Sequence, residues 1–452
     1  MPWSEAKLEA KRANSARLAG HPSTTGHGPS GKQKKEALKS HRAASREARE
    51  TDPVPPCTVV ADPQLALERV ACFRAAAAQE TTPDIAPGAR LAARLALQQA
   101  PIEAVLHHAL PLVAANQQED LIEALIRPPA FAALPRAYRH KLLKALATAP
   151  LPDDAEMHEA LLHAFISPAP DVEAGWSCST YHIGCGPPLG VRVFGGIGGG
   201  NETGGRVWDA ALALSALLLA TPTADEDALA RPRAALELGA GPGLPGLVLA
   251  SLGRTERVVL TDAVPATLEN LQRNIARLPP KAASRCEVAH LDWHTPPSVT
   301  AAEFVGFDLI LAADVVYEPM LVPPLLATIG ALLGANRHAT ALLAAERRGE
   351  ALATFETELA VLVESGVLRV VSERSEAARC ALRDPGCPFY CAPDAIERIV
   401  LLELSAGDGG SAVAAAHASS LGWEGGAAPW RVVARVDACG SASVRATCTL
   451  RH

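Results

Sequence analysis

The sequence predicts an α/β fold, in which a mostly parallel sheet of seven strands carries helices on both faces and follows an α-helical module. Three observations predict it: short apolar segments alternate with helical patterns from residue 206 to about 405, a glycine-rich loop follows the first segment, and acidic residues follow others. Such alternation is typical of a parallel sheet covered by helices. The candidate strands are 234–238, 257–262, 286–291, 307–313, 339–345, 367–373 and 397–404.

The region from about 60 to 165 has helical spacing, for example at Leu67, Val70 and Phe73, and prolines 101, 128, 135 and 150 divide it into separate helices. A short hairpin is expected around Tyr181 to Phe194. We therefore predict four parts: a disordered basic tail (1–55), a helical module (56–170), the α/β domain (171–405) and a low-complexity tail rich in Ala, Gly and Ser (406–452).

Composition excludes several classes of protein. The net charge of -7 argues against a general attraction to nucleic acid, so no direct nucleic-acid partner is expected. The ten cysteines form no zinc-binding pattern, so we expect reduced thiols and no metal. The N-terminus lacks a secretory signal, and the longest apolar run, 210–220, is too short to span a membrane. We expect a soluble, cytoplasmic protein and take a monomer as the default.

Two local runs are open to a binding interpretation. Lys32–Lys35 is a basic run that could contact RNA or serve as a nuclear signal, although a solvated tail is favoured. Gly195–Gly200 lacks the Gly-Lys-Ser/Thr that a phosphate-binding loop requires, so it is interpreted as a flexible loop.

The most informative segment is Ala235–Gly246, where an apolar strand runs into glycines and a helical pattern follows. It contains G-x-G-x-x-G, which alone would suggest a dinucleotide. Glu237 would repel a pyrophosphate but suits the cationic amino group of an amino-acid cofactor. Pro245 also removes an amide donor where a pyrophosphate would need one.

The next two strands end in residues suited to an adenosine group. Asp262 follows the second strand, where a carboxylate accepts hydrogen bonds from ribose hydroxyls; the alternative is a cap for the helix starting at Pro265. After the third strand, Asp292 could meet an adenine edge and Trp293 could cover its face, or Trp293 could belong to the core.

The fourth strand leads to Asp314 and Tyr317 at the ligand side of the sheet, and Ala313 leaves room beside them. From the residues alone, a helix cap at Asp314 and simple packing at Tyr317 remain equally open.

Taken together, four motifs resemble the protein-lysine methyltransferases of the seven-β-strand class (methyltransferase family 16). They are Val207–Leu212, Leu236–Leu244, Leu291–Trp293 and Asp314–Tyr317 with its D-x-x-Y pattern, and they cover about 200 residues. Within that class, Arg136–Leu146 followed by Glu159–Leu162 is similar to the N-terminal helices of the elongation factor 2 lysine methyltransferase family. The resemblance implies a Rossmann-like methyltransferase sheet.

The resemblance also implies roles for individual residues. Asp314 and Tyr317 would line the channel for the target lysine, with Asp314 holding the amine. S-adenosyl-L-methionine would be contacted by Trp208, Gly239, Ala240, Gly241, Asp262, Trp293 and Ala313. The expected function is protein-lysine N-methylation of a cytosolic protein. Elongation factor 2 is the expected substrate, and another translation factor or a chaperone is the alternative substrate. An NAD-dependent oxidoreductase and a non-catalytic cofactor-binding module are the competing interpretations.

Overall fold

The computed structural model describes residues 85–151, 156–166, 175–183, 187–194, 203–221, 231–294, 306–409 and 432–435. The chain divides into two units, 1–61 and 62–452, and every described residue belongs to the second. The basic tail, the helical pattern around Leu67 and the glycine run Gly195–Gly200 lie outside the described residues. Within the described part of the chain, no helix is both long and apolar enough to cross a membrane.

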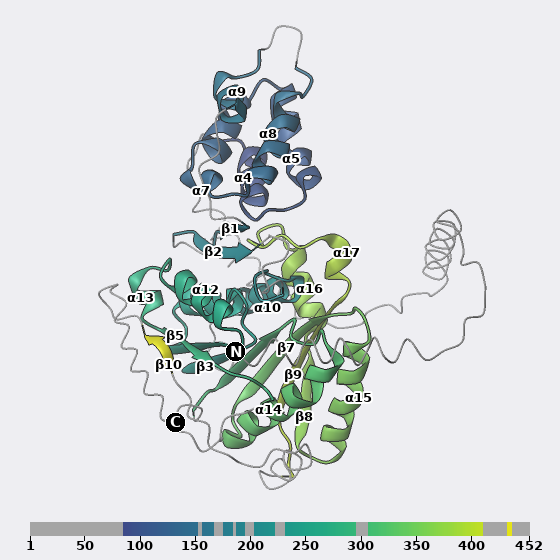
Figure 1. Cartoon of the computed structure of the whole chain (residues 1–452). Helices are drawn as coiled ribbons and strands as arrows, with labels where there is room; N and C mark the ends of the chain where they lie inside the picture. The colour runs from purple at the N-terminus through teal and green to yellow at the C-terminus, as the bar shows by residue number, and fades with distance from the viewer. Residues whose placement is uncertain are drawn as a thin grey trace, which may run out of the picture. The chain divides into compact units, whose positions relative to one another are not determined.

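The seven expected strands form one sheet, which confirms the predicted α/β fold (Figure 1). Its order is β5-β4-β3-β6-β7-β9-β8; β5 to β7 run parallel, and β9 pairs antiparallel with both β7 and β8. The strands are β3 (Ala234–Leu238), β4 (Arg257–Asp262), β5 (Cys286–His290), β6 (Leu309–Ala313), β7 (Thr340–Glu346), β8 (Leu368–Glu373) and β9 (Ile399–Ala406).

An eighth strand, β10 (Val432–Arg435), pairs antiparallel with β5 at the edge of the sheet. This strand lies within the low-complexity tail (406–452), where the sequence predicted no strand. The reason is long-range: the edge of β5 offers unpaired backbone groups that a short extended segment satisfies, whatever the composition around that segment.

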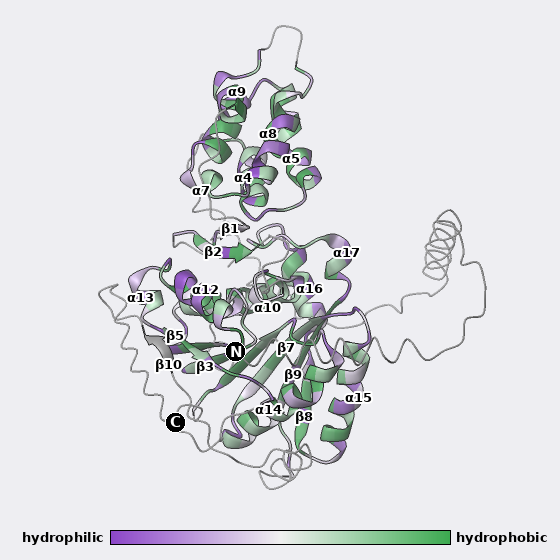
Figure 2. Ribbon diagram, viewed as in Figure 1, coloured by the Kyte–Doolittle hydropathy of each residue, from purple (hydrophilic) through white to green (hydrophobic). Residues whose placement is uncertain are grey.

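Helices cover both faces of the sheet, because its strands are apolar on both sides (Figures 1 and 2). The buried residues of α10, α11, α12 and α16 share one hydrophobic cluster, and those of α14 and α15 share the other. The α/β helices are α10 (Asp209–Ala220), α11 (Leu244–Leu252), α12 (Pro265–Ile275), α13 (Pro280–Ala283), η2 (Pro319–Leu321), α14 (Val322–Ala335), α15 (Ala351–Glu364), α16 (Ser375–Arg383) and α17 (Pro393–Ile396).

The preceding residues form the expected helices and have a hydrophobic cluster of their own. Prolines 101, 128 and 135 each stand directly before a helix, where their fixed φ fits and no amide donor is lost. The elements are α4 (Pro87–Leu97), α5 (Ile102–Ala114), α6 (Gln118–Leu121), η1 (Ile122–Ile126), α7 (Pro129–Ala132), α8 (Arg136–Ala147) and α9 (Glu159–Ile166).

A hairpin of β1 (Trp176–Tyr181) and β2 (Leu189–Phe194) follows these helices. Tyr181 ends the first strand, so the hairpin begins earlier than the sequence suggested. The residues 177–180 are Ser, Cys, Ser and Thr, which lack the apolar alternation that marks a strand.

Candidate functional site

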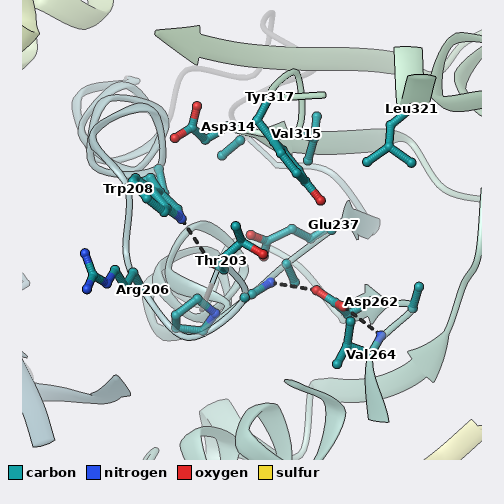
Figure 3. Close-up of a pocket in the computed structure, with 18 of the residues that line it drawn as sticks. Thr203, Arg206, Trp208, Glu237, Asp262, Val264, Asp314, Val315, Tyr317 and Leu321 are labelled. Carbon is teal, nitrogen blue, oxygen red and sulfur yellow. Dashed lines mark hydrogen bonds between the residues drawn. The ribbon is translucent and has the colours of Figure 1, made fainter. Parts of the chain in front are cut away.

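A pocket of about 450 Å³ opens at the carboxyl ends of the parallel strands. Strand β3 has β4 on one side and β6 on the other, so the chain order reverses there, and such a switch point is where ligands bind in open α/β sheets. Figure 3 shows Asp314 and Trp208 on one side of the pocket and Asp262 on the other, with Glu237 between them. All nine residues assigned to the site from the sequence line this pocket: Trp208, Gly239, Ala240, Gly241, Asp262, Trp293, Ala313, Asp314 and Tyr317.

The loop after β3 depends on glycine for its close contacts. Gly239 has φ +57°, and a Cβ there would lie 2.9 Å from Val315 Cγ1 and 3.1 Å from Trp293 Cζ2. A Cβ on Gly246 would lie 2.4 Å from Leu260 Cδ2, so this glycine lets α11 pack directly on β4. Gly239 thus lets backbone form part of the pocket wall against Val315 and Trp293, whereas Gly246 serves the packing of α11 on the sheet.

Glu237 is buried at the penultimate position of β3, and its Oε2 accepts a hydrogen bond of 2.8 Å from the Gly246 amide. Burial raises the pKa of Glu237 to about 8, partly offset by that hydrogen bond. The first turn of α11 therefore donates an amide to a carboxylate of its own chain. This arrangement argues against a pyrophosphate at the helix terminus and hence against the dinucleotide alternative.

Asp262 ends β4 and accepts hydrogen bonds from two backbone amides, one in the turn after β4 and one in the glycine loop after β3. Its Oδ1 accepts from Val264 N at 2.9 Å and its Oδ2 from Gly241 N at 3.2 Å. Burial raises the pKa of this carboxyl, while those backbone hydrogen bonds oppose the rise. Asp262 is not the cap of α12, because the N-cap residue is Val264 and no side chain caps this helix; its carboxylate holds the turn after β4 and lines the pocket.

Trp293 belongs to the pocket wall and to the core at once. Its ring lies against Gly239 and packs on the hydrophobic cluster beneath α14 and α15. Within the described part of the chain, its buried Nε1 has no hydrogen-bond acceptor. The neighbouring Asp292 lines the pocket too, and its Oδ1 accepts from His294 N at 2.9 Å. An aromatic face beside a carboxylate suits an adenine ring.

Trp208 stands directly before α10 rather than at the end of a strand. Its Nε1 donates to Thr203 O at 3.0 Å, which fixes the indole across the pocket mouth. Asp209, the next residue, is half-buried, and burial raises the pKa of its carboxyl.

Asp314 follows β6 in a left-handed backbone conformation with φ +56°, which is strained for a residue other than glycine. Its side chain is only 2% exposed, and Oδ2 accepts a hydrogen bond from Arg348 Nη2. Burial raises the pKa of Asp314 to about 6, although Arg348 lowers it. Tyr317 is 47% exposed, and its ring reaches across the pocket (Figure 3).

The sequence interpretation missed Arg348, which lines the pocket from the turn after β7. It also missed Thr203 and Arg206 in the segment before α10. The signal for Arg348 was present, because β7 neighbours β6 in the sheet and its carboxyl end must open on the same pocket.

Comparison with known proteins identifies the α/β domain. Residues 198–361 match the sequence profile of the family described as lysine methyltransferase. These residues are thus similar to the lysine methyltransferase family. This match agrees with the resemblance inferred from the motifs.

Three relatives illustrate the match. The mouse EEF1A lysine methyltransferase 3 is 37% identical over 147 residues, covering 32% of this chain and 56% of the relative. The mouse protein N-lysine methyltransferase METTL21A is 40% identical over 156 residues, covering 34% and 65%. The human protein-lysine N-methyltransferase EEF2KMT is 28% identical over 242 residues, covering 50% and 69%. The chain thus spans little more than half to about two thirds of the length of these relatives.

The residues of the pocket fit S-adenosylmethionine. Glu237 offers a buried carboxylate for its amino group, Asp262 an acceptor for its ribose, and Trp293 an aromatic face for its adenine. Gly239 contributes backbone, without a side chain, to the pocket wall beside Trp293. Small side chains at Ala240 and Ala313 keep the middle of the pocket open.

Proposed function

We propose that this chain is an enzyme that transfers a methyl group from S-adenosylmethionine to the amine of a lysine in a protein substrate. The observation that carries the proposal is Asp314: a buried carboxylate, in strained backbone, at the rim of a pocket whose other side fits the cofactor. Strained and desolvated groups concentrate at functional sites.

S-adenosylmethionine supplies a methyl group on a sulfonium, so the reaction needs no further activation of the leaving group. The chain's own residues orient and desolvate the amine. A free lysine has a pKa of about 10.4, so the side chain arrives as an ammonium beside Asp314 and releases a proton to solvent before the neutral amine attacks. Asp314 accepts a hydrogen bond from the amine and directs its lone pair, while Tyr317 forms a wall of the channel.

We assign the cofactor-binding roles to the residues that line the other side of the pocket. Their positions support these roles, since each belongs to the glycine loop, to a neighbouring strand end or to the segment before α10. They are Trp208, Gly239, Ala240, Gly241, Asp262, Trp293 and Ala313, together with Glu237.

For the substrate, we propose translation elongation factor 2. Support comes from the length of the EEF2KMT match, 242 residues, which extends beyond the 198–361 domain, whereas the EEF1A enzyme and METTL21A match over 147 and 156 residues. Another translation factor or a chaperone is the alternative. We further propose a cytoplasmic monomer whose helical module (56–170) and methyltransferase domain (171–405) act together.

The first experiment separates catalysis from cofactor binding. In Asp314→Ala, methyl transfer should be abolished while calorimetry shows cofactor affinity within about twofold of the unmodified protein. Glu364→Gln, which removes an exposed carboxylate at the end of α15, should retain full activity as the control. Retained turnover in Asp314→Ala would remove Asp314 from this role.

The second experiment finds the substrate. The purified chain and radiolabelled S-adenosylmethionine are added to a methylation-naive cell lysate, which is then resolved by size. One band at the mass of elongation factor 2, confirmed with the purified factor, supports the proposal. A labelled band at another mass supports the methyltransferase activity and excludes elongation factor 2 as the substrate. Cofactor binding with no labelled protein supports the non-catalytic module instead.

A further inference from the structure

Arg348 makes three contacts at the pocket, just beyond the end of β7. Its Nη2 donates to Asp314 Oδ2, and its Nη1 donates to Glu346 Oε2 at 3.1 Å. Its guanidinium carbon lies 4.8 Å from the centre of the Trp208 ring. The side chain is 36% exposed, so one face of the guanidinium remains at the pocket surface.

The other oxygen of Asp314 is left without a donor. Oδ1 is buried, and no described residue donates a hydrogen bond to it. A buried carboxylate oxygen without a partner is costly, so the site is incomplete until another donor arrives. Arg348 already holds Oδ2, which leaves Oδ1 as the acceptor for that donor.

The surrounding charges favour a cationic donor. Asp314 faces Glu346 at the end of β7 and Asp209 at the start of α10, and both raise its pKa; Arg348 lowers it. Arg398, just before β9, donates to Glu346 at 2.7 Å and to Asp394 at 2.9 Å.

The two guanidiniums of Arg348 and Arg398 therefore face four carboxylates, which belong to Asp209, Asp314, Glu346 and Asp394. Asp262 and Tyr317 face the group from across the pocket. A further positive charge is electrostatically favourable there.

We propose that Arg348 is a positioning residue for methyl transfer: it fixes the Asp314 carboxylate through Oδ2, so that Oδ1 is presented to the amine of the target lysine. This inference rests on the proposed lysine methyltransferase activity. Arg348 does not touch the methyl group, and its effect reaches the reaction only through Asp314.

The inference predicts a specific pH signature. Without Arg348, Asp314 would keep its acidic neighbours Glu346 and Asp209 and lose the cation that lowers its pKa, so that pKa would rise above its value of about 6. The carboxylate would then be partly protonated at neutral pH, and activity would be lost there and regained at higher pH. A merely structural role would lower activity equally at every pH.

The chain offers a matched control in the adjacent residue. Arg347 contacts Glu356 at 3.6 Å and is 54% exposed, so Arg347→Met removes the same charge one position away from the site. Arg348→Met removes the guanidinium with a side chain of similar length, and Arg348→Lys restores a cation. Melting curves establish that each variant is folded.

Initial rates from pH 5.5 to 9 at saturating cofactor are the first readout. Arg348→Met should lose about tenfold in kcat/KM at pH 7 and recover part of it by pH 8.5, with the acid limb displaced upward by roughly one pH unit. Arg348→Lys should lie between, and Arg347→Met should match the unmodified chain. An acid limb unmoved in Arg348→Met, or moved equally in Arg347→Met, would overturn the proposal.

A second readout does not depend on turnover. Carboxyl-carbon NMR of cofactor-free protein labelled at aspartate reports the pKa of Asp314, with Asp314→Asn assigning the signal. The pKa should rise in Arg348→Met and stay in place in Arg347→Met. If the unmodified chain methylates nothing, the proposed function fails, whereas an unchanged Asp314 pKa in Arg348→Met defeats the Arg348 inference by itself.

Discussion

Lowering the pH from 7 to 6 should weaken cofactor binding because Glu237 must give up a proton to receive the cofactor's amino group. Burial holds the pKa of Glu237 at about 8 in the cofactor-free protein, so this carboxyl is protonated at neutral pH. A cationic group beside it favours the ionised form, so the pKa falls on binding. Affinity therefore rises with pH up to the free-state value, and binding releases a proton.

The magnitude follows from that pKa. If the bound-state pKa lies below about 5, linkage gives an affinity about ninefold tighter at pH 7 than at pH 6, with about one proton released per cofactor at pH 6.5. This increase of affinity with pH should end near pH 7.5, because the cofactor's own α-amino group loses its proton at about 7.7–8.0. Asp314, with a pKa of about 6, contributes at the lower end of this range.

Titration calorimetry in two buffers with different ionisation enthalpies measures both the affinity and the proton count. Glu237→Gln is the reference, since its amide oxygen can still accept from Gly246 N while its side chain cannot titrate. The difference between the two proteins isolates Glu237 from Asp314. Equal proton release in both, or an affinity that does not change between pH 6 and 7, would refute the reasoning.

Three further predictions concern single side chains. Gly239→Ala forces a Cβ to 2.9 Å from Val315 and should cost roughly 1–3 kcal/mol in urea unfolding with more than about tenfold loss of cofactor affinity, whereas Gly334→Ala, in open space on α14, should cost nothing. Phe355→Ala, fully buried, should cost about 3–5 kcal/mol by the same measurement, against less than about 0.5 kcal/mol for exposed Val361→Ala. Tyr317→Phe should retain most turnover in the methyl-transfer assay, because the ring forms the channel wall, while Tyr317→Ala should lose about tenfold or more.

The sequence sufficed for the sheet and for most of the pocket. Glu237, Asp262 and Asp314 each stand at or just after the end of a parallel strand, and such ends meet at one edge of the sheet. Local pattern and strand polarity were therefore enough to predict that these carboxylates lie close together.

Other features depend on contacts that local pattern does not record. Arg347 and Arg348 look alike in the sequence, and only the register of β7 against β6 and the turn at Gly349, with φ +62°, decide which one faces the pocket. Strand β10 pairs with β5, from which more than a hundred residues separate it, and the residues of Val432–Arg435 do not indicate which strand they pair with. The number of strands at the edge of the sheet could not be predicted for this reason.

The left-handed backbone at Asp314 has a consequence for how this protein evolves. A left-handed conformation costs most residues with a Cβ roughly 1–2 kcal/mol, and costs aspartate and asparagine less, because their short side chains tolerate it. Glycine would remove the strain, since it has no Cβ. A lineage that no longer needed the reaction would therefore lose nothing in backbone conformation by replacing Asp314 with glycine, and that replacement would mark the loss of activity before the fold showed any change.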